Sequence, residues 1–221
     1  MDSGLIHILV VSGAHLHFLE RLSFWIPERG RLILCTIYCW LTGFGAPVVR
    51  ALIRRVCSNL FRSWAWTPLQ VEAKTTLLLL MIHPQWLVSR SFLMSWMCAL
   101  ALQAPLPLPK WRPLNMSLKC YLFLFPFCAA SPLSILWNSL VGPAVGGILF
   151  PASLAAIALP WIQPATDQIW RVFLAVLELG PKGPPVDDGF HILTIWWIPM
   201  VVHAGLLYGE WKWRREHAFS C

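Results

Sequence analysis

The sequence has little charge for its length. Only 12% of its 221 residues are charged, about half the share of an average soluble domain, whereas 57% are hydrophobic and the mean hydropathy is +0.62. This amount of polar surface is too small to cover a soluble globule of this size. The composition therefore predicts a membrane protein with several spans.

The sequence also lacks the motifs of several enzyme classes. It contains no GxxxxGK[ST], DxD, HExxH or HxHxDH pattern, so we expect no nucleotide site, no metal, no cofactor and no enzymatic activity. Its seven cysteines form no CxxC pair, and Cys35 and Cys39, four residues apart, are expected to be small buried side chains. The N-terminus "MDSG" lacks the positive region of a secretory signal, and its closeness to the first apolar run suggests a truncated or split protein.

Long and short apolar runs alternate along the chain. A tilted span needs about 20 residues, and the runs that meet this length are 32–49, 86–103, 133–159 and 190–209. Shorter runs lie at 5–19, 69–82, 117–130 and 168–179. We therefore predict an all-α fold, a polytopic membrane helical bundle with short or broken helices, in which residues 1–209 form the transmembrane domain and residues 210–221 a short basic tail.

The basic residues, which give a net charge of +7, are clustered. In the stretch 50–64 the arginines recur at helical spacing on one face, which is typical of an interfacial helix that reaches anionic headgroups. The alternative is a phosphate-facing surface at the mouth of a pore. Glu72, Lys74 and Arg90 lie at the starts of neighbouring runs and are expected to pair or to snorkel.

The segment "LIHILVVSGAHLHFL", residues 5–19, places polar side chains within an apolar run. Three interpretations compete: a metal site of His7 and His15, a serine nucleophile Ser12 with His15 as base, and a discontinuous helix that lines a polar conduit. The first two lack nearby carboxylates. The third is favoured because a break at Ser12–Gly13 would free backbone polar groups.

Four blocks of the sequence resemble the signature of the ComEC/Rec-two competence family, the bacterial membrane channels that pass single-stranded DNA inward during natural transformation. They are "GLIHILVVSGAHL", "TGFGAPVVRA", "SFLMS" and "SPLSILWNSLVGP", in family order over residues 4–160. Departures include Ala14, His17 and Pro47. The matching residues are His7, Ser12, Gly13 and His15 in the first block, Gly43, Val49, Arg50 and Ala51 in the second, Phe92 and Ser95 in the third, and Pro132, Leu133, Ser134, Asn138 and Pro143 in the fourth.

The resemblance implies a multi-pass protein of the bacterial inner membrane that takes up single-stranded DNA. Its implied partners are DNA, the bilayer, separate OB-like and nuclease domains, and a second copy in a homodimer. A polyanion needs hydrogen-bonding and cationic groups along its path. The expected conduit-lining residues are His7, Ser12, Gly13, His15 and Asn138, and the expected phosphate contacts are Arg50, Arg54 and Arg55.

Three alternatives to this function stay open. A small-molecule or lipid transporter would use its basic clusters only to set its topology. An intramembrane hydrolase would use Ser12 and His15. A degenerate fragment would have no function.

Overall fold

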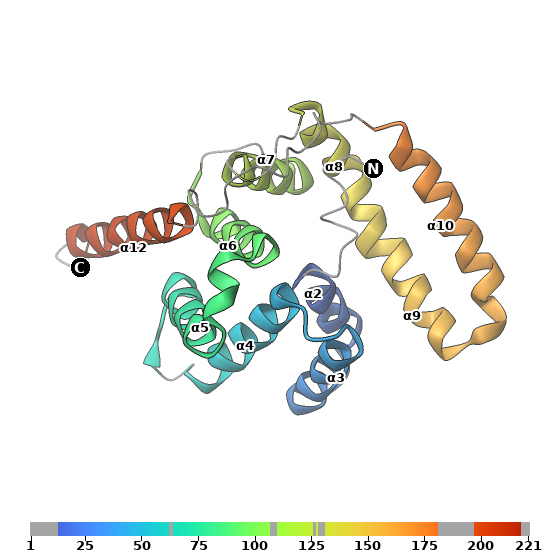
Figure 1. The fold of residues 1–221 in the computed structure, drawn as a ribbon, viewed down its shortest axis with the longest axis horizontal. Helices are drawn as coiled ribbons and strands as arrows, with labels where there is room; N and C mark the ends of the chain where they lie inside the picture. Colours follow the sequence, from blue (N-terminus) through green and yellow to red (C-terminus); the bar gives the residue numbers. More distant parts are fainter. Residues whose placement is uncertain are drawn as a thin grey trace.

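The computed structural model describes residues 13–61, 64–106, 110–125, 127, 131–180 and 197–217, and every regular element within them is helical (Figure 1). This confirms the predicted all-α class. The longer helices are α2 Gly13–Leu22, α3 Glu28–Leu41, α4 Ala46–Leu60, α5 Pro68–Ile82, α6 Arg90–Gln103, α7 Arg112–Leu124, α8 Leu133–Ala144, α9 Phe150–Ala158, α10 Gln163–Glu178 and α12 Ile198–His217. Three short helical turns are η2 Pro84–Val88, η3 Val145–Leu149 and η4 Pro160–Ile162.

The apolar run 32–49 is two helices, so the prediction of one span there is wrong. Helix α3 ends at Leu41, and the chain turns through Gly43 and Phe44, whose φ angles are +73° and +54°. Both values lie in the left-handed region that glycine adopts at little cost. Helix α4 then starts at Ala46, so the arginines from Arg50 onward lie on a different helix from the apolar residues of α3.

Helices α8, η3 and α9 form one continuous stretch, Leu133–Ala158, of 26 residues, and its most apolar window of 18 residues has a mean hydropathy of 1.9. Within the described residues it is the one stretch long and apolar enough to cross a bilayer. It contains a π-helical segment at η3, which follows Pro143 by two residues. A wide turn of this kind accommodates a backbone that proline prevents from bonding regularly. The predicted span 86–103 is divided like the run 32–49, because η2 ends at Val88 and α6 begins at Arg90. The predicted span 190–209 lies partly outside the described residues and stays a prediction.

Helix α4 lies between two apolar cores. The larger core surrounds α6, where Phe92, Leu93 and Leu100 have no exposed surface. The smaller core joins α2, α3 and α4 and includes Cys35 and Cys39, which are fully buried as predicted. Since Val49 packs against both cores, the arginines of α4 are held on a helix fixed from two sides.

Large apolar side chains cover much of the outer surface. On α5, Leu77 and Met81 are 62% and 75% exposed, and on α9 Ile157 is 76% exposed. Exposed apolar surface on this scale marks contact with another protein or with a membrane. Helix α12 extends away from the other helices toward the C-terminus (Figure 1) and crosses residues 209 and 210 without a break.

Candidate functional site

A buried ionic cluster joins α4 to α5. Arg50, in the first half of α4, has 5% of its surface exposed, and Glu72 of α5 has none. Nη1 of Arg50 donates a hydrogen bond to Oε1 of Glu72, and Nε of Arg54 lies 2.9 Å from Oε2. Both carboxylate oxygens therefore face a guanidinium, which offsets the cost of removing the charge from water.

Local sequence places these groups opposite each other. Arg50 and Arg54 are four residues apart, so they share one face of α4. Helix α5 begins at a capping box in which Thr67 accepts a hydrogen bond from the backbone N–H of Gln70, and the Gln70 side chain accepts one from the N–H of Thr67. This cap fixes where α5 starts and thereby which of its faces carries Glu72.

The same cluster reaches α6 through Ser95. Nε and Nη2 of Arg50 lie 3.2 and 3.0 Å from Oγ of Ser95, so both donate to the same hydroxyl. Arg50 thus links three helices through one side chain. Its planar, permanently charged guanidinium is suited to this fixed geometry, whereas a lysine ammonium is not.

Further buried polar groups lie along the same face of α5. Thr75 and Thr76, three and four residues after Glu72, are 0% and 2% exposed. Their hydroxyls have no hydrogen-bond partner among the described residues. One helix turn before Glu72, the carbonyl of Leu69 contacts Nε2 of His203 at 3.0 Å, which ties α12 to this region.

His203 is fully engaged in packing. In addition to its contact with Leu69, its Nδ1 accepts a hydrogen bond from the indole N–H of Trp96 at 3.2 Å. Both ring nitrogens therefore have a partner in the protein.

Arg55 belongs to a different cluster. Its Nε lies 2.8 Å from Oε1 of Glu20 in α2, and its Nη2 lies 3.4 Å from Oε1 of Glu28 in α3. The three arginines predicted to contact phosphate therefore diverge from α4 toward two sets of carboxylates. Their role at DNA stays a prediction, and a phosphate at Arg50 would have to displace Glu72.

The first predicted conduit segment is described only in part, because His7 and Ser12 lie outside the described residues. Gly13 begins α2 against α4, where an added Cβ would lie 3.0 Å from Cβ of Ala51. His15 is 8% exposed, and its ring stacks on Phe150 with centroids 5.4 Å apart. Both positions serve close helix packing in the structure, and their conduit-lining role stays a prediction.

The remaining predicted conduit residue is Asn138 of α8. It is half-buried, and its side-chain oxygen is buried without a hydrogen-bond partner in the described part of the chain. The described part of the chain also contains no group of three or more His, Cys, Asp or Glu side chains placed to hold a metal ion. The metal and hydrolase interpretations each depend on a residue that is not described.

Three of the four resembling sequence blocks meet in space. Gly13 of the first block contacts Ala51 of the second, and Arg50 of the second block contacts Ser95 of the third. Sequence reasoning missed Glu72 as the partner of Arg50 and Arg54. The sequence indicated an ion pair at Glu72 only through its place as an isolated acid near the start of an apolar run. The partners expected for Glu72 were Lys74 and Arg90. Instead, Lys74 lies 3.0 Å above the ring of Trp66, and Arg90 donates to the carbonyl of Phe127.

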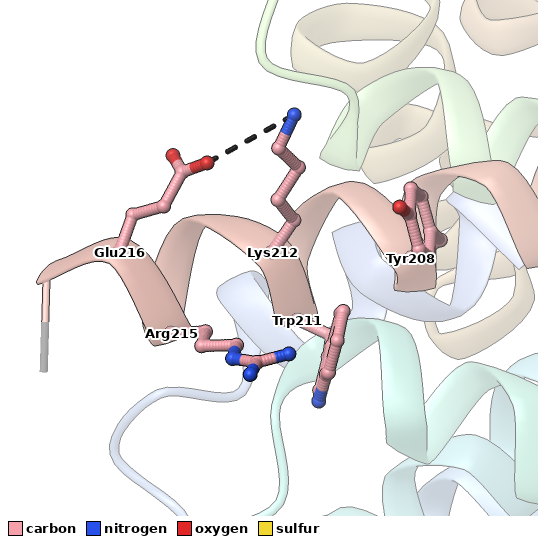
Figure 2. Close-up of a pocket in the computed structure, with 5 residues that line it drawn as sticks. All are labelled: Tyr208, Trp211, Lys212, Arg215 and Glu216. Atoms are coloured by element: carbon pink, nitrogen blue, oxygen red, sulfur yellow. Dashed lines mark ion pairs between the residues drawn. The ribbon is translucent and has the colours of Figure 1, made fainter.

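A second candidate surface lies on α12, where a shallow groove is lined by Tyr208, Trp211, Lys212, Arg215 and Glu216 (Figure 2). The Arg215 guanidinium lies 5.4 Å from the centre of the Trp211 ring, and Lys212 forms an ion pair with Glu216 at 3.9 Å. All five side chains are exposed on one helix. Exposed aromatic and basic groups at the end of an apolar helix are typical of a membrane interface.

Comparison with known proteins gives one family and one distant relative. The family model for competence proteins matches residues 1–209. An uncharacterized Escherichia coli (strain K12) protein, YcaI, is 24% identical over 240 aligned residues. The alignment covers 88% of this chain but 31% of YcaI, so the chain spans about a third of that relative. No solved structure matches the chain.

Proposed function

Because the chain belongs to the competence protein family, we propose that it is a multi-pass component of the bacterial inner membrane that passes single-stranded DNA into the cell. The observation that carries this proposal is the family match over residues 1–209, which includes all four resembling blocks. We assign the chain no catalytic step. OB-like and nuclease domains on separate chains, or a second copy of this chain, would complete the channel.

The ionic cluster supports a function that needs charge within an apolar body. Ionisable residues at membrane depth are costly and usually face a partner or a water-filled path. Here Arg50 and Arg54 together carry two positive charges against the single charge of Glu72. The surplus is one positive charge, which is the sign required near a DNA strand.

The three arginines differ in exposure, and we propose different roles for the exposed and the buried ones. The side chains of Arg54 and Arg55 are 39% and 31% exposed, so each is able to contact a phosphate without unfolding a helix. Arg50, with a side chain 7% exposed, acts as a positioning residue that fixes α4 against α5 and α6. His15 and Gly13 act in the same way where α2 meets α4 and α9.

The test is uptake of labelled DNA in cells that lack the chromosomal copy of the gene and express a variant at matched membrane abundance. Arg54→Gln and Arg55→Gln should each lower the amount of nuclease-protected strand. Arg171→Gln, an exposed arginine on α10, is the control and should leave uptake unchanged. Undiminished uptake in both arginine variants would remove the proposed phosphate contacts.

A companion variant separates position from charge. Arg50→Lys keeps the positive charge but cannot donate to Glu72 and Ser95 with one planar group. We expect Arg50→Lys to lower uptake nearly as much as Arg50→Ala, together with the thermal stability of the purified protein. Full uptake in Arg50→Lys with a loss in Arg50→Ala would show that the charge alone matters.

A further inference from the structure

A basic pocket lies between α2, α3 and α4, apart from the Glu72 cluster. Its volume is about 350 Å³, and it is lined by His17, Glu20, Arg21, Phe24, Arg31 and Arg55. The hollow is shallow and open to solvent, so a ligand in it would contact the protein on one side. The three arginines and one glutamate of the lining sum to +2 with histidine neutral, and Glu28, which also contacts Arg55, lowers the total to +1.

The carboxylates near the pocket are both directed at Arg55. Glu20 contacts it at 2.8 Å and Glu28 at 3.4 Å, so the charge of Arg55 is shared with two carboxylates. Arg21 and Arg31 form no ion pair with any described residue. The positive charge that a ligand would meet therefore comes from these two side chains.

Arg31 is partly removed from water without a compensating anion. It lies in the first turn of α3, and its Nε is buried and lacks a hydrogen-bond partner in the described part of the chain. A desolvated guanidinium without a carboxylate gains from binding an external anion. Arg21, in the last turn of α2, approaches the same pocket from another helix.

An exposed aromatic side chain adjoins these cations. Phe24 lines the pocket and is 76% exposed, and its ring lies edge-on to Trp25 with centroids 5.5 Å apart. Sites for single-stranded nucleic acid combine cations for the backbone with aromatic faces on which bases stack. A phosphodiester alone would not require the aromatic ring.

We propose that this pocket binds one nucleotide unit of a single DNA strand, with Arg21 and Arg31 on a phosphate and Phe24 stacked on a base. The proposal deepens the proposed function and rests on it. A phospholipid headgroup offers the same phosphodiester without a base, so the experiment distinguishes these two sources.

The experiment measures binding of a fluorescein-labelled oligothymidylate to the purified full chain in nanodiscs of neutral phosphatidylcholine, over a range of salt concentrations. Arg21→Gln/Arg31→Gln should raise Kd at least about tenfold at low salt and reduce the magnitude of the salt slope by about 0.7, because the contact with one phosphate of a single strand is lost. The control Arg112→Gln/Arg171→Gln removes two exposed arginines elsewhere and should leave both values unchanged. An unchanged Kd and salt slope in Arg21→Gln/Arg31→Gln would overturn the proposal that the strand binds in this pocket.

Phe24→Ala tests the base without altering charge. We expect a roughly tenfold rise in Kd with the salt slope unchanged, since stacking contributes no counterion release. Its control is Trp161→Ala, because Trp161 is an aromatic side chain with the same exposure of 76%. Equal Kd values for Phe24→Ala and Trp161→Ala would overturn the stacking role.

A lipid arm repeats the titrations in phosphatidylglycerol nanodiscs. The difference between wild type and Arg21→Gln/Arg31→Gln should persist there if the strand occupies the pocket. Its disappearance would assign the pocket to a lipid headgroup and overturn the strand as occupant. If the wild type binds no strand in either lipid, the proposed function fails as well, whereas equal binding by wild type and variant removes only this inference.

Discussion

Substitution of Glu72 by glutamine tests how the ionic cluster contributes to stability. Glutamine keeps the size of the side chain and removes the charge that faces Arg50 and Arg54. The Arg54 side chain, 39% exposed, is able to turn toward solvent, but Arg50 is 7% exposed and is held by Ser95. The variant therefore leaves a buried guanidinium without its counterion.

The expected loss is large for a single substitution. Removing one partner of a buried ion pair costs about 3–5 kcal/mol in the free energy of unfolding. For a chain of this length each kcal/mol lowers the melting temperature by about 2–4 °C, so we expect a decrease of about 6–20 °C. The double substitution Arg50→Met/Glu72→Leu removes both charges and should destabilise the protein less than Glu72→Gln.

The assay is thermal unfolding of the purified protein in detergent, followed by the loss of helical circular dichroism. Glu216→Gln is the matched control, because Glu216 is 58% exposed and pairs with Lys212 at 3.9 Å. Exposed pairs of this kind contribute at most about 1 kcal/mol. A melting temperature of Glu72→Gln within about 2 °C of the wild type would refute the reasoning.

Two further predictions concern packing and hydrogen bonding. Gly146→Val should lower the melting temperature by at least about 4 °C, because an added Cβ would lie 2.4 Å from the ring of Phe18. Gly142→Ala is the control and should be nearly neutral, because a Cβ at Gly142 has no neighbouring atom within 4 Å. Equal melting temperatures for the two variants would contradict the close approach of α2 at Gly146. Ser95→Ala should cost about 1–3 kcal/mol in the free energy of unfolding, since Arg50 loses the acceptor for two of its donors; unaltered chemical denaturation would show that this hydroxyl is dispensable.

The helical class and the short helices followed from the sequence because they depend on local composition. Apolar runs interrupted by proline predict short helices, and Cys35 and Cys39 share one buried face as their spacing indicates. The break inside 32–49 was missed because hydrophobicity alone does not report backbone direction. Its signal was "TGFG", where Gly43 and Phe44 adopt positive φ.

The partners of the arginines did not follow from the sequence. Helical spacing predicted that the arginines of the stretch 50–64 share one face, and the structure bears this out for Arg50 and Arg54, which both contact Glu72, but not for Arg55. It could not show that Arg55 would turn toward Glu20, because that contact depends on how α2 packs against α4. The motif resemblance identified Arg50 and Ser95 but not Glu72, the acid that pairs with Arg50.

The resemblance to competence proteins was confirmed by the family match over residues 1–209. The structure adds that residues from three of the matching blocks lie in contact, through Gly13 with Ala51 and Arg50 with Ser95. Blocks far apart in the chain thus form one packed region around α4. The proposal that these residues line a conduit is a separate claim, namely that single-stranded DNA passes beside the packed region around α4.

The most direct test of that claim is the amount of labelled single-stranded DNA that becomes protected from added nuclease in cells with and without the gene. The account predicts that deletion abolishes protection and that expression of the wild-type chain restores it, while DNA bound at the cell surface stays constant. Equal protected strand in deleted and complemented cells would contradict a role for this protein in DNA passage.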